Sequence, residues 1–310
     1  MSSTIPRGFF LVFVLAVFAA INSPALAWDP MGHMIVNQIA WDRLTPKARA
    51  DVKKSLAAFN KKNATDYDFV TAGCWMDDIR GKTREYNTWH YIDLPYNPTG
   101  TPFPVDWQVN GLWAMRHCVA ILRGERTDPD IDKDQALVML THLVGDLHQP
   151  LHATNRNGDA GGNGVSVPNI QDANVEIFPK WRNLHYFWDT SYRRTVRDGD
   201  VVELYAEPVH LVDQPVARHQ KSLPLVREQA AAFQKSPSSK EIVAGGDLKS
   251  WVEESHALGY TEGYQKLPGD AESTVVTLDD IYVDNAREIS QKRVTQAGLR
   301  LAGLLNEISQ

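Results

Sequence analysis

Residues 142–152, with the sequence His-Leu-Val-Gly-Asp-Leu-His-Gln-Pro-Leu-His, constrain the fold more than any other stretch of the chain. His142 and Asp146 stand four residues apart, so on a helix their side chains share one face. Pro150 cannot continue that helix, and His152 therefore arrives from a turn beyond its end. Two ligands on a rigid helix and a third folded back would build a metal site. The alternative is a set of ordinary polar residues on a half-exposed helix.

Apolar residues recur at helical spacing along much of the remaining chain. Two short segments, 165–167 and 175–178, alternate instead between apolar and polar residues, which predicts a small hairpin. The expected fold is therefore mainly α, a single helical domain over residues 28–310 with a minor β-hairpin. Helices are expected over residues 32–44, 46–59, 106–123, 132–148, 183–196, 247–264 and 278–306.

The first 27 residues have the pattern of a secretory signal peptide. Arg7 precedes an apolar run over residues 8–20, and Ala25-Leu26-Ala27 offers a cleavage site. The run is too short to span a bilayer comfortably. We therefore expect a secreted or periplasmic protein whose mature chain begins at Trp28.

The two cysteines of the chain, Cys74 and Cys118, predict one disulfide in an oxidising compartment. The alternative is two buried thiols that pack as small apolar residues. So few cysteines also favour a bacterial rather than a eukaryotic source.

The net charge of −6 argues against a broad basic surface that would grip duplex nucleic acid through its phosphates. Phosphate substrates are not excluded, because bound divalent metals can dominate the local field.

Candidate ligands also occur at four places outside residues 142–152. Imidazole and carboxylate groups without thiolates suit zinc, or a similar first-row metal, at a catalytic site rather than a structural one. The pair His185 and Asp189 repeats the spacing of His142 and Asp146. The four segments are Trp28-Asp29-Pro30-Met31-Gly32-His33, Trp75-Met76-Asp77-Asp78-Ile79-Arg80, Trp89-His90-Tyr91-Ile92-Asp93 and Asn183-Leu184-His185-Tyr186-Phe187-Trp188-Asp189.

Taken together, these motifs resemble those of the zinc-dependent single-strand-specific nucleases of the S1/P1 type. The resemblance implies a mainly α fold shared with zinc phospholipases C, and three zinc ions. It assigns one zinc to Asp77, His90 and His142, with Asp146 shared as a bridge. It assigns the second to the main-chain amine and carbonyl of Trp28 together with His33 and Asp146, and the third to His152, His185 and Asp189.

The resemblance also implies a mechanism, in which a metal-bridging hydroxide attacks a phosphodiester in line. The third zinc would stabilise the leaving 3′-oxygen, and the products would carry 5′-phosphates. Asp77 would act through its metal, and Arg80 would neutralise charge on the phosphorus; the alternative for Arg80 is a surface ion pair. Because a terminal amine can ligate only when it is free, Trp28 would bind metal only after cleavage of the signal peptide.

Substrate contacts are expected from Tyr91, Asp93 and Asn163. An aromatic face stacks on any base, while a carboxylate accepts hydrogen bonds from a base edge. The alternative for Tyr91 is a place in the core. The family usually has Phe at this position, and Tyr91 keeps the aromatic face needed for stacking. His148 lies off the metal face and is expected to be structural.

The expected function is a secreted zinc-dependent endonuclease that cleaves single-stranded DNA and RNA and releases phosphate from 3′-nucleotides. We expect a monomer without membrane association. One alternative is a zinc phospholipase C, and another is a non-catalytic exported zinc-binding protein. The Tyr91/Asp93 pair and the spacing of Asp77 and Arg80 favour nucleotides.

Overall fold

The computed structural model describes residues 28–96, 109–205, 215–236, 245–270 and 272–310. The predicted signal peptide lies outside these residues. The α-helices are α1 (Pro30–Arg43), α2 (Pro46–Asn63), α3 (Phe69–Ala72), α4 (Trp75–Asp78), α5 (Gly111–Arg123), α6 (Lys133–Asp146), α7 (Ala173–Ile177), α8 (Leu184–Thr190), α9 (Pro215–Lys235), α10 (Leu248–Leu258) and α11 (Asp280–Ile308). Short helical turns and two strands complete the fold: η1 (Asn87–His90), η2 (Pro150–Ala153), η3 (Pro179–Trp181), η4 (Ser191–Arg193), the π-helix η6 (Gly259–Tyr264), β1 (Arg194–Arg197) and β2 (Asp200–Glu203).

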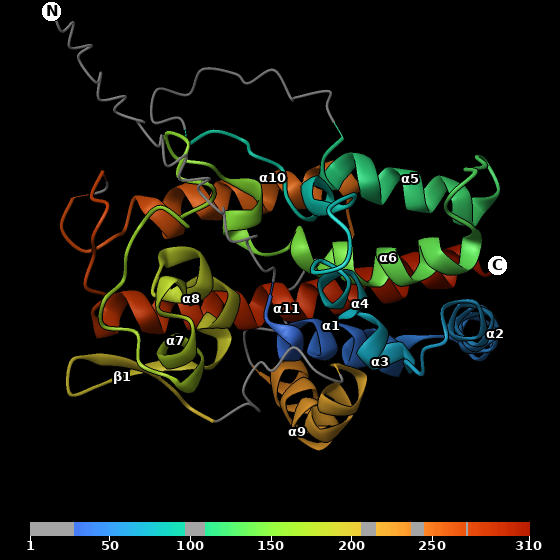
Figure 1. The fold of residues 1–310 in the computed structure, drawn as a ribbon, viewed down its shortest axis with the longest axis horizontal. Coiled ribbons are helices and arrows are strands. Elements are labelled where there is room, and N and C mark those ends of the chain that lie inside the picture. The colour runs from blue at the N-terminus through green and yellow to red at the C-terminus, as the bar shows by residue number, and fades with distance from the viewer. Residues whose placement is uncertain (1–27, 97–108, 206–214, 237–244, 271) are drawn as a thin grey trace, which may run out of the picture.

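The long helices pack as a layered bundle around α6 and α11. In Figure 1, α6 and α11 cross the middle of the molecule, α5 and α10 lie above them, and α1 and α9 lie below. Helix α1 packs against both α11 and α9, and α5 packs against α6. The mainly α fold predicted from the periodicity is confirmed.

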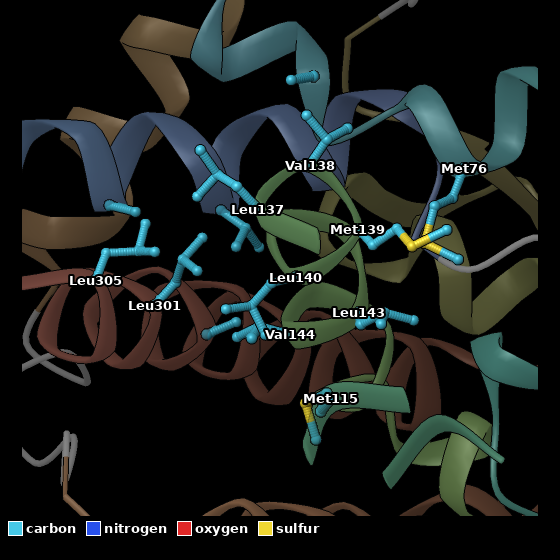
Figure 2. Close-up of a cluster of buried hydrophobic side chains, with 14 of the residues drawn as sticks. Met76, Met115, Leu137, Val138, Met139, Leu140, Leu143, Val144, Leu301 and Leu305 are labelled. Atoms are coloured by element: carbon cyan, nitrogen blue, oxygen red, sulfur yellow. The ribbon is translucent and has the colours of Figure 1, made fainter. Parts of the chain in front are cut away.

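Apolar residues of α6 make the centre of the core (Figure 2). Leu137, Leu140 and Val144 of α6 lie opposite Leu301 and Leu305 of α11, and all five are buried. Burial of each such side chain stabilises the fold by roughly 1.5–3 kcal/mol. Helix α6 is therefore a rigid support for any functional groups that it carries.

The ends of α6 follow from its sequence. Asp132 caps the helix by accepting a hydrogen bond from the Gln135 amide, and the helix ends at Asp146. Pro150 then begins the short turn η2, as expected of a residue that cannot extend the preceding helix. His152 consequently lies on η2, beyond the end of α6.

The predicted hairpin at residues 165–167 and 175–178 is wrong. The second segment falls largely in α7, whose first amides are capped by the Asp172 carboxylate. The hairpin of the described residues is instead β1 paired antiparallel with β2. Asp198 and Gly199 make its turn with positive φ angles of 53° and 87°, and Asp-Gly is a favoured hairpin sequence. The helix predicted over 183–196 accordingly stops at Thr190.

Three other elements differ from the expectations. Helix α9, which contains Pro224, was not predicted. The helix expected over 247–264 divides into α10 and the π-helix η6, and α5 begins only at Gly111, where Asn110 caps it. Residues 106–108 of the predicted helix lie outside the described residues. Within the described part of the chain, no helix combines the length and apolar character needed to cross a membrane.

The predicted disulfide between Cys74 and Cys118 is not formed. Both side chains are buried thiols. The Cys74 thiol donates to the carbonyl of Pro30 at 3.4 Å, so it is directed towards α1. Cys118 lies on α5, and burial raises the pKa of its thiol to about 12. The alternative, two thiols that pack as small apolar residues, describes the structure.

Candidate metal centre

Three groups of buried or nearly buried histidine and aspartate side chains could each hold a metal ion. Within each group the ligand atoms lie within 4.8 Å of one another. The eight side chains in these groups are the eight that the sequence predicted as metal ligands. The groups are His33 with His142 and Asp146, Asp77 with His90 and His142, and His152 with His185 and Asp189.

Asp146 connects the first two groups. Its Oδ1 lies 3.2 Å from Nε2 of His33 on α1. Its Oδ2 lies 2.9 Å from Nδ1 of His90 on η1 and 3.1 Å from Nε2 of His142, one turn earlier on α6. Asp77 on α4 lies further out, 3.9 to 4.0 Å from the same three histidines. One carboxylate at the end of α6 thus lies between ligands from α1 and η1.

The third group lies where η2 meets α8. Nδ1 of His152 donates to the carbonyl of His90 at 2.7 Å, and Nδ1 of His185 donates to the carbonyl of Gly161 at 2.7 Å. Because a carbonyl only accepts, each ring carries a proton on Nδ1, and in a neutral ring the lone pair is then at Nε2. Those two Nε2 atoms are 3.1 Å apart, and Asp189 lies 3.7 to 3.9 Å from them. Two facing lone pairs on neutral rings would repel each other, whereas a cation between the two Nε2 atoms would be coordinated by both.

The same argument holds at His142. Its Nδ1 contacts the Gly73 carbonyl at 2.6 Å, so Nε2 faces the centre of the site. Burial lowers the pKa of His142, but the Asp146 and Asp77 carboxylates outweigh burial and raise it to about 9. The two carboxylates therefore favour a positive charge at this nitrogen. A bound metal ion supplies such a charge, so the donor set fits a metal.

Three other side chains of these groups have strongly shifted pKa values, and the directions of the shifts differ. Burial, followed by the charge of Arg80, lowers the pKa of His90 to about 4. Burial raises the pKa of Asp189 well above its usual value. The pKa of Asp146 lies well below its usual value because His142, His33 and His90 outweigh burial. Such opposed shifts in one buried cluster are typical of functional sites.

Several buried atoms of the cluster lack a hydrogen-bond partner among the described residues. Such atoms usually have a partner in folded proteins. Although His33 Nε2 and Asp146 Oδ1 are only 3.2 Å apart, their orientation makes no hydrogen bond. Metal coordination would satisfy these atoms, which are Nε2 of His33, Nε2 of His90, Oδ2 of Asp77 and Oδ1 of Asp146.

Trp28 lies beside the first two groups and is fully buried. Its indole nitrogen donates to the carbonyl of Gly145 at 2.9 Å, directly before Asp146 in the chain. A side chain at Gly145 would begin 2.9 Å from Nδ1 of His33, so glycine is what allows the His33 ring to approach α6. The structure thus brings the predicted first residue of the mature chain to the candidate ligand side chains.

Two more predicted residues lie at the edge of these groups. Arg80 donates to Oδ1 of Asp77 at 3.2 Å, and its side chain is only 7% exposed, so the alternative of a surface ion pair does not describe it. Tyr91 is half-buried, which does not fit the alternative of a core residue. Burial and then the Asp93 carboxylate raise the pKa of Tyr91, which places Asp93 near it.

Asn163 lies in the loop that orients His185. Its side-chain amide donates to the carbonyl of Ala160 at 2.8 Å, and Gly161 in the same loop accepts from His185. The positive φ of Gly161, 62°, and a Cβ position only 2.5 Å from the Leu151 carbonyl favour glycine there. The loop is therefore ordered against the third group.

His148 takes no part in the three groups, as expected. Its Nδ1 donates to the carbonyl of Val144 at 2.6 Å, and its Nε2 accepts from Arg300 at 3.0 Å. Two buried arginines of α11 that hydrogen-bond to this residue, Arg293 and Arg300, were not predicted from the sequence. A further residue that was missed is Gln149, whose amide donates to Oδ1 of Asp189 at 2.6 Å; its place inside the motif was the available signal.

The chain is similar in sequence to a family of known proteins over most of its length. The family model described as S1/P1 nuclease matches residues 28–310. Endonuclease 4 of Arabidopsis thaliana is 27% identical, over 99% of this chain and 97% of its own length. Nuclease S1 of Aspergillus oryzae is 24% identical over 96% of this chain and 98% of its own length, and nuclease P1 of Penicillium citrinum is 23% identical over 91% and 97%.

Proposed function

Since the chain belongs to the S1/P1 nuclease family, we propose that it is a secreted zinc-dependent endonuclease that cleaves single-stranded DNA and RNA. The position of Asp146 between ligands from two other elements is the observation that carries this proposal. Products with 5′-phosphates and release of phosphate from 3′-nucleotides are part of it. The eight candidate ligand side chains lie together within a single chain, so the proposed site needs no residue from a second subunit, and a monomer is part of the proposal. No observation favours a zinc phospholipase C.

The proposed metal complement is three zinc ions, one at each group. Asp77, His90 and His142 would hold one, and His33 with the main chain of Trp28 would hold the next. Asp146 would be shared by these two, and His152, His185 and Asp189 would hold the third. Bound zinc supplies Lewis-acid polarisation of a phosphoryl oxygen and acidifies bound water.

The remaining roles fall to side chains around these groups. The Arg80 guanidinium would neutralise charge that develops on the non-bridging oxygens of the attacked phosphate. Tyr91 would stack on a base, and Asp93 would accept hydrogen bonds from its edge. Asn163, on the loop that contacts His185, would contact the same nucleotide. Because an aromatic face stacks on any base, we expect low sequence preference.

The products test the proposed reaction. Digestion of a single-stranded oligonucleotide is expected to leave 5′-phosphate and 3′-hydroxyl ends, and 3′-AMP but not 5′-AMP is expected to release phosphate. Mass spectrometry of the fragments and a phosphate assay measure both. Fragments that end in 3′-phosphates would overturn the proposal.

Replacement of Arg80 by alanine is expected to lower kcat by about 100-fold, because one charge-stabilising group is lost from the transition state. With zinc in excess, the zinc content is expected to stay at the wild-type value, since Arg80 contacts Asp77 but is not one of the proposed ligands. Steady-state kinetics and metal analysis of one preparation measure the two effects. An unchanged kcat would remove Arg80 from the mechanism.

Replacement of Tyr91 by alanine is expected to raise KM for a single-stranded oligonucleotide by about 10-fold, because base stacking contributes roughly 1–3 kcal/mol per base. Tyr91→Phe keeps the aromatic face and is the matched control, expected to stay near wild type. Equal KM values for the alanine variant and the wild type would contradict stacking at this residue.

A further inference from the structure

Asp29, the residue after Trp28, has a buried carboxylate on which four donors converge. Its Oδ1 accepts from the Gly32 amide at 3.0 Å and from the Tyr192 hydroxyl at 2.5 Å. Its Oδ2 accepts from Arg193, at 2.5 Å from Nη2 and 3.1 Å from Nε. Capping of α1 requires only the contact with Gly32. The contacts with Tyr192 and Arg193 therefore need another explanation.

Those two partners join the start of the mature chain to the third metal group. Tyr192 and Arg193 are fully buried on η4, which follows α8 and its ligands His185 and Asp189. The amide of Asp29 also donates to the carbonyl of Asp189 at 3.3 Å. We call Asp29, Tyr192 and Arg193 the N-terminal clamp.

Stability alone is a weak reason for such a cluster. Burial of an ion pair costs desolvation of both charges, and apolar replacements of similar size are often at least as stable. A buried carboxylate whose Oδ2 accepts two hydrogen bonds from one guanidinium, and whose Oδ1 accepts from Tyr192, is nevertheless held in a defined position by these charge-assisted bonds. The clamp is therefore better suited to holding a neighbouring group in place than to stabilising the bundle.

That neighbour is Trp28. The indole of Trp28 is held by the Gly145 carbonyl of α6 at 2.9 Å, and its ring packs edge-on against Tyr192 with centroids 6.1 Å apart. The next residue is held by the clamp. The carbonyl of Trp28 lies in the chain between these two anchors, and the main-chain nitrogen is attached to the Cα that carries the anchored indole, so both have little freedom to move.

We propose that the N-terminal clamp positions the main chain of Trp28 for metal binding beside His33 and Asp146. The inference rests on the proposed function, because it takes the terminal amine and carbonyl as ligands. Asp29, Tyr192 and Arg193 are positioning residues in it and bind neither metal nor substrate.

The test is Asp29→Asn in protein that is exported from the full-length gene, with the Trp28 terminus verified by intact mass. Asparagine keeps an oxygen for the Gly32 amide, but it loses the charge that Arg193 pairs with. Asp172→Asn is the matched control. Asp172 pairs with the adjacent buried arginine, Arg194, at 2.5 Å. Arg193 also forms an ion pair with Glu203, and Arg194 lies 3.9 Å from the same carboxylate, so each variant leaves its arginine with one acidic neighbour.

We expect Asp29→Asn to bind about one zinc ion fewer than the wild type at limiting free zinc, or to hold that ion 10–100-fold more weakly, as is usual when a group that orients a ligand is lost. Its kcat should fall with the lost ion. Both variants should lower the melting temperature of the protein by similar amounts. In Asp172→Asn, however, the zinc content and kcat should stay at wild-type values. Zinc analysis, zinc titration and thermal unfolding measure these effects.

Two results would overturn the clamp: wild-type zinc affinity in Asp29→Asn, or an equal loss of zinc in Asp172→Asn. Tyr192→Phe removes one hydrogen bond and keeps the packing, so it serves if Asp29→Asn is not exported; unchanged zinc affinity in it would then overturn the clamp. A wild type that neither binds zinc nor cleaves polynucleotide would overturn the proposed function, and the clamp with it.

Discussion

Replacement of Asp146 by asparagine is expected to unseat two metal ions together and to lower kcat/KM by at least about 1,000-fold, more than loss of a single charge-stabilising group usually costs. The reason is the position of the carboxylate. Its two oxygens face His33 on one side and His90 with His142 on the other. Asparagine retains the shape but removes the charge and one acceptor oxygen. Metal analysis and steady-state kinetics measure both effects.

His148→Asn is the matched control for Asp146→Asn. His148 is equally buried and lies two residues further along the same stretch, but its ring bonds to Val144 and Arg300 and not to the metal groups. We expect it to lower the free energy of unfolding by about 1–3 kcal/mol through its lost hydrogen bonds while its zinc content stays at the wild-type value. An Asp146→Asn variant that keeps all its zinc, or a His148→Asn variant that loses as much, would contradict the shared position.

Replacement of Asp189 by asparagine is expected to empty the third group alone. The side chains of His152 and His185 would remain, but they lack a charged partner that can share the ion. We expect one zinc ion fewer and a kcat lowered by about 100- to 1,000-fold, the usual cost of losing one stabiliser of a developing oxyanion. Loss of two or more ions would show that the groups are not independent.

In the absence of metal, Asp189→Asn is expected to raise the free energy of unfolding at neutral pH. Burial raises the pKa of Asp189 well above its usual value, so without metal the folded state holds a proton that the unfolded state releases above about pH 4. The free energy of unfolding of the wild type should therefore fall as the pH rises above that value. Asp189→Asn lacks this titration and should be the more stable protein at neutral pH in chelator. Urea unfolding across pH 4–8 measures the difference, and parallel curves for the two proteins would contradict it.

The sequence predicted which histidine and aspartate side chains lie together because their signals are local. His142 and Asp146 are one helical turn apart, and Pro150 sets the end of the helix; both features survive any change of distant packing. The core of α6 could be predicted for the same reason, from its leucine spacing. Even the misplaced hairpin had a local signal, the Asp198-Gly199 turn, which the weak alternation of its flanking residues concealed.

Interactions between residues that lie far apart in the sequence could not be predicted from the sequence. The ion pair between Asp29 and Arg193 joins residues 164 positions apart. The spacing of apolar residues along the chain does not indicate a pair of this kind. Arg300 breaks the rule that charged side chains face water, because Glu254 and His148 accept its hydrogen bonds inside the bundle. Helix α9 escaped prediction because Pro224 interrupts its pattern, and a proline inside a helix normally indicates a break.

The most direct test of the central claim is a substrate panel for the zinc-loaded mature protein: single-stranded DNA, RNA and phosphatidylcholine, each with and without a chelator. The three buried groups and the family membership predict cleavage of both polynucleotides, loss of that cleavage on chelation, its return when zinc is restored, and no release of the lipid headgroup. Cleavage of lipid alone, or undiminished cleavage of polynucleotide by protein shown to be free of metal, would contradict the claim.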